Sequence, residues 1–110
     1  MREYSKSVAR YIRQYARAAH EEELRRALEP LAAKFDEWRA GSLSSDELSN
    51  AIHVFHDGPS RELFKFYTQP ALLDSAVAYA IVKGVLDQAT LEPAVLKALA
   101  PLIRTYRATS

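Results

Sequence analysis

Residues 2–19 read REYSKSVARYIRQYARAA, and this stretch decides the fold class. Cations recur in it at steps of four, four, three and four residues, which is the repeat of one face of an α-helix. On an ideal helix these cations fall within an arc of roughly 80°. The cations are Arg2, Lys6, Arg10, Arg13 and Arg17. The apolar side of the predicted amphipathic helix carries Tyr4, Val8, Tyr11, Ile12, Tyr15 and Ala19.

The helical pattern continues to residue 39, but its phase changes near residues 21–23. Pro30 also lies inside the pattern and removes one helical hydrogen bond. We therefore expect either two helices or one long kinked helix between residues 5 and 39. The core positions predicted for its second half are Leu24, Leu28, Leu31, Phe35 and Trp38.

Turn and cap signals divide the following residues into further helices. Gly41 ends the first region, and Ser44 with Glu47 forms a capping box that opens a helix over residues 45–56. Gly58 and Pro59 predict the end of that helix, with Pro59 as the first residue of the next one.

The most apolar segment covers residues 71–83 and follows a break at Pro70. We expect it to be the central helix, with Ile81 in the core and Gly84 as its C-terminal cap. A final helix begins at Pro93, and Pro101 should kink it.

Composition agrees with this division into helices. Only three glycines are present, and no segment shows sustained strand-like alternation. The sequence therefore predicts an all-α fold, a single compact bundle of about five or six helices, some of them short or proline-kinked. At 110 residues the chain has the size of one ordinary domain, so we expect a single helical domain over residues 1–110.

Charge, cysteine content and hydropathy exclude several classes of function. A net charge of +1 gives no overall attraction to nucleic acid or to an anionic membrane. The chain has no cysteine, which excludes a disulfide framework, a thiol nucleophile and a Cys-ligated metal. Residues 1–10, MREYSKSVAR, contain no apolar run like that of a signal peptide, and no stretch is long enough to span a membrane. We expect a cytoplasmic protein that needs no cofactor.

His53, His56 and Asp57 are a candidate metal site. On a helix they lie three and four residues apart on one face, and two imidazoles with a carboxylate suit a divalent metal such as zinc or iron. The alternative is structural, because the pair His56-Asp57 directly precedes Gly58-Pro59 and a histidine near a helix C-terminus is stabilised by the helix dipole.

An adjacent His-Asp pair also forms the core of the HD-type metal phosphohydrolases, which are all-helical enzymes. Those enzymes need a second histidine upstream and a second aspartate downstream. His20 with either Asp74 or Asp87 could take these places in this chain. A dipeptide does not establish membership of that family.

The cationic stripe and the tyrosines beside it form a candidate interaction surface. The cations could dock an acidic partner or contact phosphates, while the plain alternative is a solvated helix face. Tyrosine suits both half-buried positions and interfaces between copies, because its ring is apolar and its hydroxyl stays hydrated. The surface comprises Arg2, Lys6, Arg10, Arg13, Arg17, Tyr11 and Tyr15.

These observations favour a non-enzymatic helical interaction or regulatory module that self-associates or binds a protein partner, without a membrane. Two alternatives stay open. One is a small metal-dependent phosphohydrolase that uses His53, His56 and Asp57. The other is a nucleic-acid-associated protein that uses the basic first helix.

Overall fold

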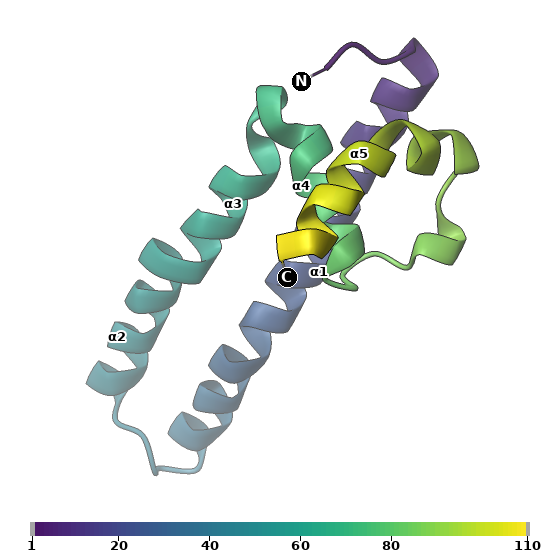
Figure 1. Cartoon of the computed structure of the whole chain (residues 1–110). Coiled ribbons are helices and arrows are strands. Elements are labelled where there is room, and N and C mark those ends of the chain that lie inside the picture. Colours follow the sequence, from purple (N-terminus) through teal and green to yellow (C-terminus); the bar gives the residue numbers. More distant parts are fainter. Residues whose placement is uncertain (1, 110) are drawn as a thin grey trace.

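The computed structural model describes residues 2–109, and within them the chain is helical with no β-strand (Figure 1). The α-helices are α1 (Lys6–Arg39), α2 (Ser45–Phe55), α3 (Arg61–Thr68), α4 (Leu73–Val82) and α5 (Pro93–Thr109). A π-helical turn, η1 (His56–Ser60), joins α2 to α3. Two short 3-10 turns are η2 (Pro70–Leu72) and η3 (Gln88–Thr90). The predicted all-α class is confirmed.

The helices form a long antiparallel hairpin with a second layer at one end (Figure 1). One limb of the hairpin is α1, and the other is the continuous run of α2, η1 and α3. Helices α4 and α5 pack at the end that holds the N-terminal half of α1. We call residues 23–60, which extend beyond α4 and α5, the arm, and the rest of the chain the base.

The molecule is longer than the predicted compact bundle. Its extents are 53 × 25 × 24 Å and its radius of gyration is 17.2 Å, against about 13 Å for a compact chain of this length. The physical reason is the incomplete second layer, because α4 and α5 are too short to cover the whole hairpin.

Helix α1 is a single element of 34 residues with Pro30 inside it, so the predicted alternative of two separate helices is wrong. The phase change near residues 21–23 has another cause. In the base, α1 buries Val8, Ile12, Ala16 and Ala19 in the core it shares with α4 and α5. In the arm the helix packs against α2 instead, which lies in a different direction. The apolar stripe shifts because the packing partner changes.

The prediction that Gly58 and Pro59 end the second helix is also wrong. The chain stays helical through η1, and the residues on either side of it, Phe55 and Arg61, have ordinary right-handed helical angles. A π-turn replaces the regular i to i−4 hydrogen bonds locally. It therefore accommodates a proline, which has no backbone N–H to donate.

The predicted caps are present. The Ser44 backbone N–H donates to Glu47 Oε1 at 3.1 Å, and the Glu47 N–H donates to Ser44 Oγ at 3.1 Å. At the end of α4, Gly84 has a φ of +73°, which favours glycine, and the Val85 N–H donates to the Ala80 carbonyl at 2.9 Å.

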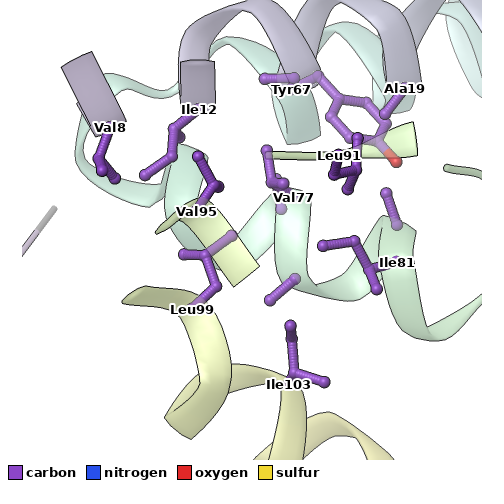
Figure 2. Packing of buried hydrophobic residues seen from close by; sticks show 14 residues of the cluster. Val8, Ile12, Ala19, Tyr67, Val77, Ile81, Leu91, Val95, Leu99 and Ile103 are labelled. Atoms are coloured by element: carbon purple, nitrogen blue, oxygen red, sulfur yellow. The ribbon is translucent and has the colours of Figure 1, made fainter. Parts of the chain in front are cut away.

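The main cluster of buried hydrophobic residues lies in the base (Figure 2), and Leu48 of α2 is a buried apolar side chain in the arm. Ile12, Val77, Val95 and Leu99 are fully buried at its centre. Helix α4 supplies Ala76, Val77, Ala78, Ala80 and Ile81, which confirms its predicted central position. Among the described helices, none has the length together with the apolar composition that crossing a membrane requires.

Candidate interaction surfaces

A groove on one face of the arm lies between α1 and α2 and is almost entirely apolar. Its volume is about 260 Å³. Lys34 is the one charged residue in its lining, and the Val54 side chain stands open to solvent, with 57% of its surface exposed. The groove is lined by Ala27, Pro30, Leu31, Lys34, Ala51, Val54, Phe55 and Pro59.

This groove continues the face of α1 that is buried in the base. Residues 12, 16, 19, 23, 27, 30 and 34 follow one another at steps of three or four, so they lie along one side of the helix. In the base this side is packed into the core by α4 and α5, as Ile12 and Ala19 show (Figure 2). In the arm the same side borders the open groove at Ala27 and Pro30. One helix face is thus covered at one end and bare at the other.

The core stripe predicted for the arm is only partly buried. Leu24, Leu31 and Phe35 are half-buried between the two limbs of the hairpin. Leu28 and Trp38 are exposed, and the Trp38 indole N–H donates to Ser45 Oγ at 3.0 Å. The prediction that these five side chains form a core is therefore wrong. The second layer, α4 with α5, does not extend over the arm.

Lys34 and Glu47 carry opposite charges on the part of the arm near the tip of the hairpin, residues 40–44. Hydrogen bonds from Ser44, and to a smaller extent the positive charge of Lys34, hold the pKa of the Glu47 carboxyl below its usual value. Lys34 lines the groove, whereas Glu47 lies in the first turn of α2 and is not part of the groove lining.

The cationic stripe lies where the sequence predicts it, on the solvent side of α1. Lys6, Arg10, Arg13 and Arg17 are all exposed. Among residues 2–109 no acidic side chain forms a salt bridge with any of these four cations. Arg10 lies 5.9 Å from the centre of the Tyr11 ring, and Arg2 is exposed just before the helix begins. Binding of an anionic partner at this stripe stays a prediction.

The tyrosines beside the stripe serve the fold of this chain. Tyr11 and Tyr15 stack on each other with their ring centres 5.8 Å apart, and both are half-buried against the core. The Tyr15 hydroxyl accepts a hydrogen bond from the Glu92 backbone N–H at 2.9 Å, at the start of α5. These contacts within the chain leave less of both rings available to a second copy.

The predicted metal residues lie at the junction of α2 and η1, on the surface of the arm. His53 Nε2 lies 3.0 Å from Asp57 Oδ2, and both side chains are exposed. His56 borders a separate surface hollow with Asp57 and Arg61. Within the described residues no group of three or more His, Asp or Glu side chains is arranged to hold a metal ion. The metal hypothesis therefore rests on sequence spacing alone.

The further residues that a phosphohydrolase would need are engaged elsewhere. His20 stacks on Tyr67 with ring centres 5.8 Å apart. Asp74 accepts a hydrogen bond from the Tyr4 hydroxyl at 2.9 Å, and Asp87 caps η3 by accepting from the Ala89 N–H. Each of the three carries out a structural task that is separate from His53, His56 and Asp57.

No family model, curated protein or solved structure matches this chain.

Proposed function

We propose that the chain is a non-enzymatic helical interaction module that self-associates through the grooved face of its arm. The observation that carries the proposal is the continuous face of α1, which α4 and α5 cover in the base and leave bare in the arm. Removing apolar surface from water contributes roughly 25 cal/mol per Å². The bare part of the α1 face, which continues the part buried in the base, is therefore a favourable docking surface.

A second copy of the chain fits this face for two reasons. A helical hairpin forms half of a four-helix bundle, and a second hairpin supplies the missing layer. The arm and the base also carry opposite formal charges, −3 over residues 23–60 and +4 over the rest of the chain. A second copy therefore meets opposite charge when the arm of each copy lies against the base of the other.

Two neighbouring residues of α2 provide a matched test. Val54 lines the groove, whereas Ile52, which is 41% exposed, lies outside it because two helical positions differ by about 200° in direction. We expect the original chain to show a concentration-dependent rise in mass by light scattering. Val54→Arg should abolish that rise by placing a charge in the interface, and Ile52→Arg should leave it intact.

Helical circular dichroism of both variants serves as the control for folding. A mass that stays monomeric up to several hundred micromolar would contradict self-association. Equal loss of association in both variants would show that the grooved face has no special part in it.

A further inference from the structure

Resting on the self-association proposed above, we infer that two copies pair in an antiparallel orientation, arm on arm, with each tip beside the base of the other copy. The two-fold axis lies between the arms and perpendicular to them. It places α1 opposite α1 of the second copy, running in the opposite direction, and α2 opposite α2. The axis passes α1 near the middle of the arm, around Pro30 and Leu31.

The second layer of the base excludes the parallel arrangement. Helices α4 and α5 pack on the same side of α1 that continues into the groove. If both arms pointed the same way, the α4–α5 layers of the two copies would occupy the same space between the hairpins. In the antiparallel arrangement each arm instead lies over the part of the other hairpin that the α4–α5 layer leaves uncovered. A packed helix layer is about 10 Å thick, so an arm has the same thickness as the α4–α5 layer beside it.

Charge favours the same orientation. The arm, residues 23–60, contains seven acidic and four basic side chains, a formal charge of −3. The base contains seven acidic and eleven basic side chains, a formal charge of +4. An antiparallel pair brings each negative tip next to a positive base, whereas a parallel pair would bring like charges together at both ends.

The size of the arm sets the expected strength of the pair. From residue 23 to residue 39, α1 is about 24 Å long, and two adjacent helices are about 20 Å wide. The face thus offers roughly 500 Å² per copy as a flat area, below the roughly 800 Å² per partner of a standard stable interface. We therefore expect a reversible dimer that forms at tens to hundreds of micromolar.

One engineered cysteine distinguishes the two orientations, because the natural chain has none. Ala40→Cys places a nitroxide spin label at the tip, on an exposed residue at the end of α1. Nine residues separate it from the centre of the arm, so the antiparallel dimer should give a label-to-label distance of roughly 27–35 Å by pulsed electron resonance. A parallel dimer would give less than about 20 Å.

We expect the long distance, and we expect Val54→Arg in the labelled chain to remove it while Ile52→Arg preserves it. A dimer with the short distance would overturn the antiparallel orientation and leave self-association standing. A chain that remains monomeric by light scattering at several hundred micromolar would overturn both proposals, and would leave the groove to a helix of a different protein.

Discussion

Asp74 is a charged residue at the start of the most apolar helix, and only 4% of its surface is exposed. Its carboxylate accepts hydrogen bonds from the Tyr4 hydroxyl at 2.9 Å and from the Ser75 backbone N–H at 2.8 Å. A buried carboxylate is tolerated when donors satisfy it. These contacts attach the segment before α1 to the start of α4, two parts of the chain that are distant in sequence.

Tyr4→Phe should therefore lower the free energy of unfolding by about 1–3 kcal/mol, because it removes one donor from a buried carboxylate. Urea denaturation followed by circular dichroism measures the change. Ser75→Ala, which keeps the backbone N–H that Asp74 uses, is the matched control and should cost less. An equal loss in both variants would contradict the assigned role of the Tyr4 hydroxyl.

The same contact has a signature at high pH. Burial, followed by the hydrogen bond and the negative charge of Asp74, raises the pKa of Tyr4 from 10.0 to about 12. Since only the neutral phenol donates, the contact stabilises the fold fully below pH 10 and is lost as pH rises toward 12. Burial also raises the pKa of Tyr67, so tyrosinate absorbance should show late-ionising tyrosines, and Tyr4→Phe should remove one of them. Ionisation of every tyrosine near pH 10 would contradict it.

At the scale of single elements, caps were predictable and helix ends at proline were not. The capping box at Ser44 and Glu47 uses atoms within four residues of one another, so its pattern is complete in the local sequence. The helix end predicted at Gly58-Pro59 assumed that no other hydrogen-bond pattern was open to the backbone there. The π-helical turn η1 supplies such a pattern, and the contacts of α2, η1 and α3 along α1 favour a continuous limb.

Ser44→Ala should reduce the free energy of unfolding by about 1 kcal/mol, since it removes the side chain that caps α2. Ser49→Ala, at an exposed position within α2, is the control and should be nearly neutral. The pKa of Glu47 is lowered in the folded chain, so its part of the box is present at neutral pH and is lost as pH falls below the ordinary value of 4.5. The cost of Glu47→Ala, measured against the original chain, should therefore shrink in acid, and an unchanged cost would contradict the ionised Glu47 partner.

At the scale of the whole molecule, stability and association are expected to reside in different parts. The fully buried side chains are all in the base, and the arm holds most of the exposed large apolar residues. Those residues include Leu28, Trp38, Ile52 and Val54. The base is therefore the part that folds around a core, and the arm is the part that carries the proposed docking face.

Ile81→Ala should cost about 2–5 kcal/mol of unfolding free energy, because it removes core contacts and leaves a cavity. Leu28→Ala, at a leucine that is 41% exposed in the arm, should cost far less. Chemical denaturation at low protein concentration, where dimers dissociate, measures both. A loss at Ile81 below about 1 kcal/mol would contradict a core centred on α4.

Local sequence was enough to predict the helical class, the caps at Ser44 and Gly84, the central position of α4 and the cationic side of α1. Each of these follows from residues within one or two helical turns, or from an apolar run that is buried under any arrangement. The metal prediction for His53 and Asp57 also came from local spacing, yet among residues 2–109 no third ligand joins this pair.

The exposure of half of the apolar stripe from Leu24 to Trp38 follows from tertiary packing and could not be predicted from the sequence. The periodicity of residues 12–19 and that of residues 24–38 both indicate a helix face that packs against another element. Which face receives a covering layer depends on the length and direction of α4 and α5, elements more than 30 residues away in the chain. Local sequence shows that a side chain is apolar, whereas its burial depends on all the elements that pack around it. The groove lies in the arm because α4 and α5 do not cover α1 there.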